Sequence, residues 1–135
     1  MQLADVLTTD RVRLDATASS KKTLLEKVAA LLSKDPNSAA ERDIFESLCQ
    51  RERLGSTGLG SGVAIPHGRS TGQQDITGAI IRLKKPIDFD APDQEKVDIF
   101  FALAIPDECS DGHLKLLANL AEFFKDKGHL DAVRA

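Results

Sequence analysis

The sequence of 135 residues has no Trp, no Tyr and only six Phe. Proteins that bind single-stranded nucleic acid stack its bases on exposed aromatic rings, so the scarcity of rings argues against that class. The formal net charge of −3 argues the same way, because binding to a polyanion depends on an excess of Lys and Arg. We therefore expect no nucleic-acid partner.

Metal ligands are also few. The two cysteines, Cys49 and Cys109, are far apart and form no C-x-x-C pair, and the three histidines form no H-E-x-x-H motif. Zinc sites in proteins usually carry one of these patterns, so we expect neither a metal nor another cofactor. Two reduced thiols explain the cysteines better than a single disulfide.

Long apolar runs are absent as well. No run approaches the roughly 20 residues that a membrane-spanning helix needs. The N-terminal sequence MQLADVLTTD has neither the basic nor the apolar region of a signal peptide. We expect a cytoplasmic protein without membrane insertion. The length and the 41% of hydrophobic residues fit one domain over residues 1–135.

The apolar periodicity predicts two helices in the first half of the chain. Leucines and valines at three- and four-residue spacing follow Ser20 and stop at residues 35–37. Ser38 and Glu41 then form an S-x-x-E capping box, which predicts that a second helix begins there. This helix is expected to end at Gly55, because glycine is common just after a helix.

Short runs of β-branched and aliphatic residues predict the strands. These runs are residues 12–14, 63–65, 76–83 and 97–105. The last run reads VDIFFALAI and is almost continuously apolar, which is typical of a strand buried on both faces. Residues 85–95 are expected to form a connecting loop with at most one edge strand.

A third helix is predicted for residues 111–127, a short amphipathic turn for residues 3–7 and the start of another helix for residues 130–133. Helices and strands mix without a regular βαβ rhythm. This favours a single α/β domain with a mixed central sheet flanked by helices. Since the sequence stops within the last predicted helix, we expect the domain to lack its last C-terminal helix.

Five of the nine glycines fall between Gly55 and Gly68, in the stretch RERLGSTGLGSGVAIPHGR at residues 51–69. Glycine lets the backbone adopt positive φ angles and lets a ligand approach bare amides. Pro66 fixes the backbone just before His67. The stretch therefore predicts a loop and a rigid elbow that hold an anion, most simply a phosphate.

The known nucleotide motifs do not fit this stretch. A P-loop counted from Gly55 reaches Gly60 correctly, but Ser61 stands where the lysine is required. A dinucleotide fingerprint counted from Gly58 places Val63 where its third glycine belongs. The glycines are thus not explained by nucleotide binding.

His67 is the candidate that remains. A neutral imidazole is a competent nucleophile towards phosphorus, and phosphoryl transfer needs little more than positioned cations and N–H or O–H donors. Ser56, Thr57 and the amides of the loop, including that of Gly68, are candidate phosphate-binding groups. The sequence therefore predicts a phosphohistidine site.

Spacing alone leaves two interpretations open for each of two further candidates. Arg51 or Arg53 provides a cation for bidentate contact with a phosphate, but basic residues in a last helical turn also complement the helix dipole, and spacing does not choose between the two. His113 begins the third predicted helix, where it can bond to a phosphate near the helix N-terminus. A half-buried capping histidine explains it equally well.

With these residues in hand, the chain resembles the fructose/mannitol-type enzyme IIA family of the bacterial phosphotransferase system, and most of all its nitrogen-regulatory, PtsN-like branch. The stretch at residues 51–69 resembles the active-site signature of the family. Three further segments support the resemblance, which covers nearly the whole chain. They are SKKTLLEKVAALL at 20–32, PIDFDAPDQEKVDIFFALAIP at 86–106 and HLKLLANLAEFF at 113–124.

The resemblance implies a mixed α/β fold and names the parts of the site. His67 matches the phosphorylated histidine, His113 the second active-site histidine, and Arg51 the basic residue of the site. The implied function is that of a phosphoryl carrier, which receives its phosphoryl group from a histidine-containing phosphocarrier protein without a nucleotide or a metal. In the nitrogen-type branch, the phosphorylation state then governs regulatory proteins or transporters.

Two other functions stay open at this point. The first is a sugar-specific enzyme IIA of a fructose or mannitol transporter, which uses the same chemistry. The second belongs to another class: a module that binds an anion or a partner without any covalent step.

Overall fold

The computed structural model describes residues 9–36, 38–107, 111–126 and 128, and for residues 9 and 111–114 it describes the backbone alone. The expectations for residues 3–7 and 130–133 lie outside the described residues. No helix in the described ranges is both long enough and apolar enough to cross a membrane.

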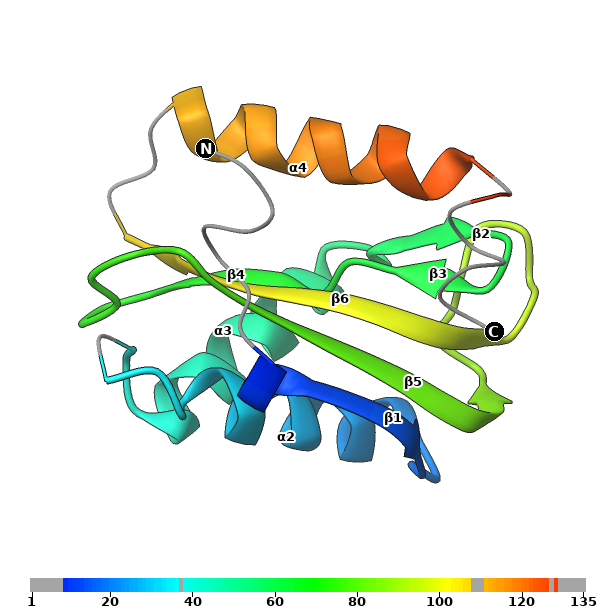
Figure 1. Cartoon of the computed structure of the whole chain (residues 1–135), viewed down its shortest axis with the longest axis horizontal. Coiled ribbons are helices and arrows are strands. Elements are labelled where there is room, and N and C mark those ends of the chain that lie inside the picture. The colour runs from blue at the N-terminus through cyan, green and yellow to red at the C-terminus, as the bar shows by residue number, and fades with distance from the viewer. Residues whose placement is uncertain (1–8, 37, 108–110, 127, 129–135) are drawn as a thin grey trace.

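A mixed sheet of six strands forms the centre of the described part of the chain (Figure 1). Its main order is β1 (Val12–Ala16), β5 (Thr77–Ile87), β6 (Val97–Pro106), β3 (Val63–Ala64) and β2 (Gly58–Gly60), with β4 (His67–Ser70) also paired to β6. β1 is parallel to β5, and β5 is antiparallel to β6. β3 and β4 are parallel to β6, and β2 is antiparallel to β3. The predicted α/β domain with a mixed central sheet is confirmed.

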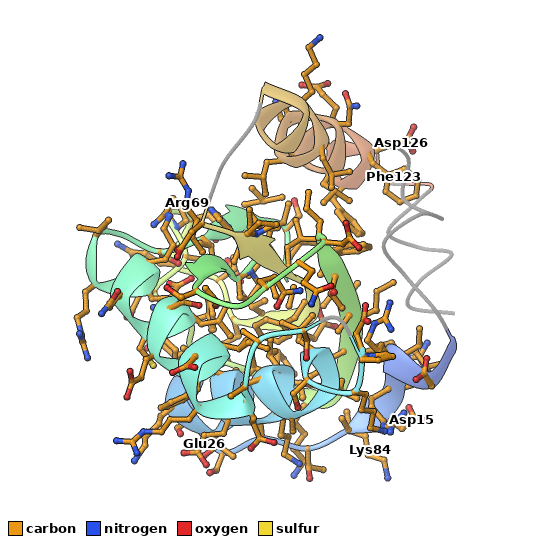
Figure 2. All side chains as sticks on the ribbon, turned by 90° about the vertical axis from the view of Figure 1, so that its left-hand side faces the viewer. Asp15, Glu26, Arg69, Lys84, Phe123 and Asp126 are labelled. Atoms are coloured by element: carbon orange, nitrogen blue, oxygen red, sulfur yellow. The ribbon has the colours of Figure 1, made fainter. Side chains whose placement is uncertain are left out.

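Helices cover both faces of this sheet. α2 (Lys21–Leu32) and α3 (Glu41–Arg53) lie on one face, and α4 (Asp111–Lys125) lies on the other, as Figures 1 and 2 both show. A short 3-10 turn, η1 (Thr9–Arg11), precedes β1. The three predicted helices are therefore present, and α4 ends at Lys125.

The side chains of β6 point alternately to the two faces of the sheet, so this strand contributes to a hydrophobic core on each face. Phe100, Ala102 and Ala104 belong to the core under α2 and α3. Phe101 and Leu103 belong to the core under α4, together with other sheet residues and the buried face of that helix. All these side chains are at most 2% exposed, so β6 is buried on both faces as its continuous apolar sequence predicts.

The predicted capping box at Ser38 is wrong. α3 begins at Glu41 with Ala40 as its N-cap, and no side chain caps it. The hydroxyl of Ser38 instead donates to the carbonyl of Ala39 at 3.0 Å. The N–H of Ala39 donates to the side-chain oxygen of Gln73 at 2.9 Å, and this distant contact fixes the chain outside the helix until Ala40.

β5 is longer than predicted. The expected strand ends at residue 83, but β5 continues through Pro86 to Ile87. Ile87 pairs with Val97 across a register shift in the β5–β6 ladder, and a proline is tolerated at such an irregularity because the regular ladder hydrogen bond is already absent there. The expected loop is correspondingly shorter.

The glycine-rich stretch is also more regular than predicted. Expected as a loop and an elbow, it contains β2 and β4, and β3 ends one residue earlier than predicted. Ser61, at φ 57°, and Gly62, at φ 82°, form the turn between β2 and β3. Glycine favours this left-handed region. The sequence of the stretch has no strand periodicity, and its strands exist because they pair with β6 or with each other.

Candidate functional site

His67 is the first residue of a strand, and its position is set by β6. β3 and β4 lie one after the other beside β6, with Val63 opposite Ile99 and His67 opposite Leu103. Between them, the carbonyl of Pro66 accepts the N–H of Leu103 at 2.9 Å. Proline contributes only an acceptor, and here that acceptor is used, so the ladder continues across the proline. The candidate nucleophile is thus fixed to the central strand of the domain.

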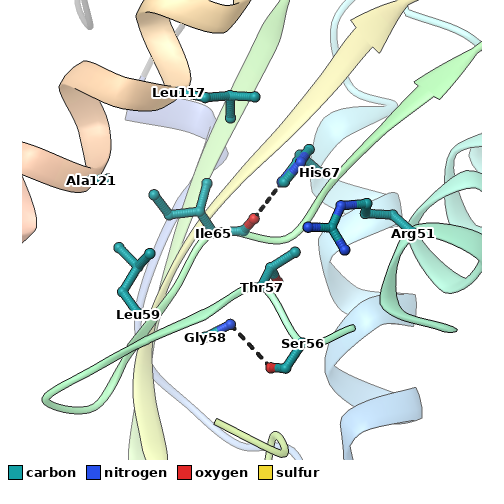
Figure 3. Close-up of a pocket in the computed structure, with 9 residues that line it drawn as sticks. All are labelled: Arg51, Ser56, Thr57, Gly58, Leu59, Ile65, His67, Leu117 and Ala121. Carbon is teal, nitrogen blue, oxygen red and sulfur yellow. Dashed lines mark hydrogen bonds between the residues drawn. The ribbon is translucent and has the colours of Figure 1, made fainter. Parts of the chain in front are cut away.

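The ring of His67 is held by its own neighbour. Its Nδ1 lies 2.7 Å from the carbonyl oxygen of Ile65 (Figure 3). A carbonyl is only an acceptor, so Nδ1 carries the proton and donates it. The other ring nitrogen, Nε2, then has the free lone pair. The hydrogen bond therefore selects the tautomer in which Nε2 has a lone pair available to attack an electrophile.

A pocket of about 210 Å³ lies in front of this ring. Figure 3 shows its walls arriving from separate parts of the fold: Arg51 from α3, residues 56–59 from the glycine-rich stretch, and α4 from the opposite side. The complete lining is Arg51, Ser56, Thr57, Gly58, Leu59, Ile65, His67, Leu117 and Ala121. The pocket is large enough for a phosphate and opens to solvent.

Arg51 is the cation of the pocket. It lies in the last turn of α3, and its Nη1 donates to the carbonyl of Gly55 at 2.9 Å. A guanidinium has several more N–H donors, so this bond orients the group and leaves donors for an anion. Arg53 is exposed and does not line the pocket. The structure thus places Arg51, and not Arg53, at the pocket, whereas sequence spacing does not distinguish the two arginines.

The surroundings keep the imidazole neutral. Burial lowers the pKa of His67 below its ordinary value of 6.5, and the positive charge of Arg51 lowers it further. The bond to Ile65 and the negative charge of Glu52 act in the opposite direction, but the net shift of the pKa is downward. At neutral pH the ring is therefore the uncharged, nucleophilic form.

Ser56 and Thr57 line the pocket, but their hydroxyl protons are directed elsewhere. Ser56 donates to the carbonyl of Phe89 at 2.8 Å and accepts the N–H of Gly58 at 3.0 Å. The hydroxyl of Thr57 donates to the carboxylate of Glu52. Their role as phosphate donors stays a prediction, and in this structure they stabilise the loop.

Gly68 is not among the residues that line the pocket. It is buried where β4 packs on α3, and a Cβ at this position would lie 2.6–2.8 Å from the Oγ, carbonyl carbon and carbonyl oxygen of Ser47. Such distances are shorter than any van der Waals contact, so only glycine fits without movement. The structure gives Gly68 a packing role next to His67.

His113 lies in the first turn of α4, but its side chain is outside the described residues. Leu117 and Ala121 follow at intervals of four residues, and both line the pocket. Residues four apart lie on one face of a helix, so the backbone places His113 on the pocket-facing row. Its predicted role stays a prediction.

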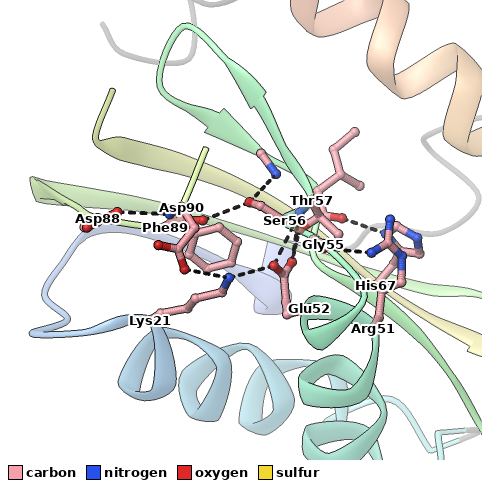
Figure 4. A network of polar contacts seen from close by, with 12 residues as sticks. Lys21, Arg51, Glu52, Gly55, Ser56, Thr57, His67, Asp88, Phe89 and Asp90 are labelled. Atoms are coloured by element: carbon pink, nitrogen blue, oxygen red, sulfur yellow. Dashed lines mark hydrogen bonds and ion pairs between the residues drawn. The ribbon is translucent and has the colours of Figure 1, made fainter. Parts of the chain in front are cut away.

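One part of the site is not predictable from the sequence. The carboxylate of Glu52, 5% exposed, forms an ion pair with Lys21 at 2.9 Å and accepts the N–H of Thr57 at 3.2 Å (Figure 4). Lys21 also lies 3.4 Å from Asp90 and 4.6 Å above the ring of Phe89. These residues come from three separate segments, and only the fold brings them together.

Two other chemistries find no support in the described residues. Residues 68–72 read G-x-S-x-G, the pattern of a hydrolase nucleophile. However, Ser70 is buried within β4 and its hydroxyl donates to that of Ser47 at 3.0 Å. A hydrolase would present this serine on an exposed strand-to-helix turn. Within the described ranges, no three His, Cys, Asp or Glu side chains gather as a metal site would require.

Comparisons with known proteins show the family to which the chain belongs. The family model described as "Phosphoenolpyruvate-dependent sugar phosphotransferase system, EIIA 2" matches residues 5–135. The "Nitrogen regulatory protein" of Pseudomonas aeruginosa is 38% identical over 135 residues, which are all of this chain and 88% of that protein.

Solved structures show the same relationship. The crystal structure of nitrogen regulatory protein IIA-Ntr from Neisseria meningitidis is 44% identical, with a TM-score of 0.88, and the match covers 93% of this chain and 86% of that one. A chain in the structure of the complex of enzyme IIAMtl with phosphorylated enzyme IIBMtl from Escherichia coli is 17% identical to this chain. The match has a TM-score of 0.75 and covers 90% of this chain and 83% of that one. The latter likeness shows the fold alone.

Proposed function

The chain belongs to the EIIA 2 family of the phosphoenolpyruvate-dependent sugar phosphotransferase system, in its nitrogen-regulatory branch, and we propose that it is a phosphoryl carrier with His67 as the acceptor. The observation that carries the proposal is the hydrogen bond between Nδ1 of His67 and the carbonyl of Ile65. It leaves Nε2 unprotonated in a half-buried ring that lines a pocket with an arginine.

The donor in this proposal is the phosphohistidine of a small histidine-containing phosphocarrier protein of the nitrogen type. The Nε2 lone pair of His67 attacks phosphorus in line, the new P–Nε2 bond forms, and the P–N bond to the donor histidine breaks. The donor imidazole leaves with its electron pair. Since one P–N bond replaces another, no nucleotide and no metal is consumed in the step.

The pocket supplies what such a transfer requires. Phosphoryl transfer is catalysed mainly by positioning and by donors around the equatorial oxygens. Arg51 provides a fixed guanidinium, which forms bidentate contacts with phosphate oxygens. Once His67 is phosphorylated, its ring carries positive charge, and the carbonyl of Ile65 stabilises that charge through the Nδ1 proton.

His113 is the proposed second histidine of the site. Its place one turn before Leu117 puts it on the row of α4 that faces the pocket, and there it would donate to the phosphoryl oxygens. Ser56, Thr57 and the amide of Gly68 remain proposed phosphate-binding groups. Both hydroxyls already donate within the protein, so each would have to turn from its present acceptor to bind a phosphate.

Downstream, we propose that the phosphorylation state governs contacts with regulatory proteins or transporters. Nitrogen regulatory proteins match all of this chain at 37–38% identity, whereas a sugar-specific EIIABC component matches it at 29%, and this difference favours the regulatory role over delivery of phosphate to a sugar permease. The two roles share their chemistry and differ in their upstream carriers.

The test is transfer from a phosphorylated carrier to the purified chain. The wild-type chain should gain one acid-labile phosphoryl group, seen as an added phosphate mass on the intact protein. His67→Ala should gain none, and His113→Ala should gain it more slowly. His129→Ala, which removes the third histidine, is the control and should behave as wild type.

Three outcomes separate the alternatives. If His67→Ala still gains the phosphate mass, the assignment of the nucleophile is wrong. If no phosphate mass appears on the wild-type chain with any carrier, the protein is a non-covalent binding module. Faster transfer from a sugar-type carrier than from a nitrogen-type carrier would favour the sugar-specific enzyme IIA role. Restored sugar transport in a strain without its own enzyme IIA would then establish that role.

A further inference from the structure

A buried carboxylate lies directly behind the phosphate pocket. Glu52 follows Arg51 in α3, and its side chain is 5% exposed. It receives two donors from Thr57, the backbone N–H at 3.2 Å and the hydroxyl. A buried carboxylate is costly unless its charge is compensated as well as hydrogen-bonded, and Lys21, 2.9 Å away, provides that compensation.

The negative charge of Glu52 acts on His67, the proposed phosphoryl acceptor. Glu52 follows Arg51 in the chain and accepts the N–H of Thr57, and both of these residues line the pocket with His67. In agreement with this placement, the carboxylate of Glu52 opposes the lowering of the pKa of His67 by burial and Arg51. An incoming phosphoryl group brings negative charge to the same place. A Glu52 carboxylate without its lysine would therefore repel the group that the pocket must bind, and it would compete for the guanidinium of Arg51.

Lys21 does not touch the pocket itself. It is not among the residues that line it. It extends from the first turn of α2 to Glu52, with Phe89 beneath its ammonium group and the exposed Asp90 at 3.4 Å (Figure 4). The ion pair with Glu52, at 2.9 Å, is the contact through which the charge of Lys21 comes nearest to the pocket residues Arg51 and Thr57.

We propose, on the basis of the carrier function proposed above, that Lys21 is a positioning residue for phosphoryl transfer that acts by neutralising Glu52. The ion pair lets Glu52 fix the loop through Thr57 without presenting a net negative charge to the phosphate. Glu52 thus holds the loop through its hydrogen bonds with Thr57. Lys21 screens the negative charge of Glu52 from the pocket, and only this second role depends on Lys21.

Three variants separate the two roles. Lys21→Met keeps the length of the side chain and leaves Glu52 uncompensated, so single-turnover transfer from the phosphorylated carrier to His67 should slow about tenfold, the size expected for one unscreened charge within several ångströms. Glu52→Gln keeps a carbonyl oxygen for the donors of Thr57 and removes the charge, so it should stay within about threefold of wild type. The double variant, Lys21→Met with Glu52→Gln, should recover to a similar rate, because neither charge remains to be compensated.

Matched controls use the same helices. Lys22→Met removes a charge from the exposed neighbour of Lys21 in α2, and Glu46→Gln removes one from an exposed position of α3. Neither should change the rate. Amide exchange at Thr57 reports whether the loop stays fixed, and all rates are expressed per folded molecule, measured by circular dichroism, so that instability alone does not count as slow transfer.

The outcomes are distinct. If the wild-type chain takes up no phosphoryl group, the carrier function fails. If it does, and Lys21→Met transfers as fast as wild type, the role of Lys21 is overturned. If Lys21→Met is slow and the double variant is no faster, the pair acts mechanically and the electrostatic role is overturned. Only rescue of Lys21→Met by Glu52→Gln supports the proposal.

Discussion

The Nδ1 of His67 lies 2.7 Å from the carbonyl oxygen of Ile65, two residues earlier in the same segment. Pro66 stands between the two residues and has a fixed φ, so both partners of this contact belong to one short segment, which β6 holds in place. The segment that carries the nucleophile also chooses its tautomer.

The first prediction follows from that contact. The phosphoryl group should be attached to Nε2 of His67, with the proton retained on Nδ1, because the bond to Ile65 leaves only Nε2 with a lone pair. Nitrogen-15 NMR of the phosphorylated chain, labelled at histidine, distinguishes the two attachment sites. Phosphorylation at Nδ1 would contradict the assignment of the tautomer.

The second prediction concerns pH. Protonation removes the lone pair of Nε2, and burial together with Arg51 lowers the pKa of His67 below 6.5. The neutral acceptor should therefore persist as pH falls through 6.5, and it should be lost only at lower pH. Arg51→Gln removes the positive charge that helps to lower the pKa, so the titration of His67 should move to higher pH.

Proton NMR of the His67 ring measures both titrations, and the resonances are assigned by their loss in His67→Gln. Arg53→Gln, which removes an exposed charge from the same turn, should leave the titration nearly unchanged. A midpoint at or above 6.5 in the wild-type chain, or one that is insensitive to Arg51→Gln, would rule out the electrostatic description of the site.

The third prediction separates the two arginines. Arg51→Ala should slow phosphoryl transfer by roughly 10²-fold, the usual effect of removing one fixed donor to a developing anion. Arg51→Lys should recover part of the rate because the charge returns without the bidentate geometry. Arg53→Ala, at an exposed position outside the pocket, should transfer at the wild-type rate. Equal losses for Arg51→Ala and Arg53→Ala would mean a diffuse electrostatic effect.

The fourth prediction concerns stability. Gly68→Ala should lower the free energy of unfolding by about 1–3 kcal/mol, because overpacking a tight contact forces the backbone apart. Two of the three atoms that the new Cβ would meet belong to the backbone of Ser47, so Ser47→Ala should not rescue the loss. Urea denaturation measures the effect. Gln50→Ala, at an exposed position of α3, is the control and should change stability by less than about 0.5 kcal/mol.

Much of the fold was predictable because its signals are local. The helices at Lys21–Leu32 and Glu41–Arg53 follow from apolar periodicity, and β6 from an apolar run too short for anything but a buried strand. The strands β2 and β4 were not, because their residues show neither alternation nor β-branched side chains. They are strands only because β3 and β6 offer them hydrogen-bonding partners. β2 pairs with the neighbouring β3, and β4 pairs with β6, whose residues are far away in the sequence.

The candidate site divides in the same way. His67 and Arg51 were predictable, since one stands between Pro and Gly and the other ends a helix before the glycines, although choosing Arg51 over Arg53 required the resemblance or the geometry. Lys21 and Glu52 were not, because an ion pair between α2 and α3 has no signature in either segment. The incorrect cap at Ser38 has the same origin, since a contact with Gln73 overrides the local motif.

The continuity of β3, Pro66 and β4 along β6 has a consequence for signalling. The proposed acceptor nitrogen belongs to a segment that is paired with the central strand, so its backbone cannot shift without breaking hydrogen bonds of that ladder. Gaining or losing a phosphoryl group should then leave the shape of the protein almost unchanged. A regulatory target that distinguishes the two states must sense the charge at the mouth of the pocket, so its discrimination should weaken as salt concentration rises.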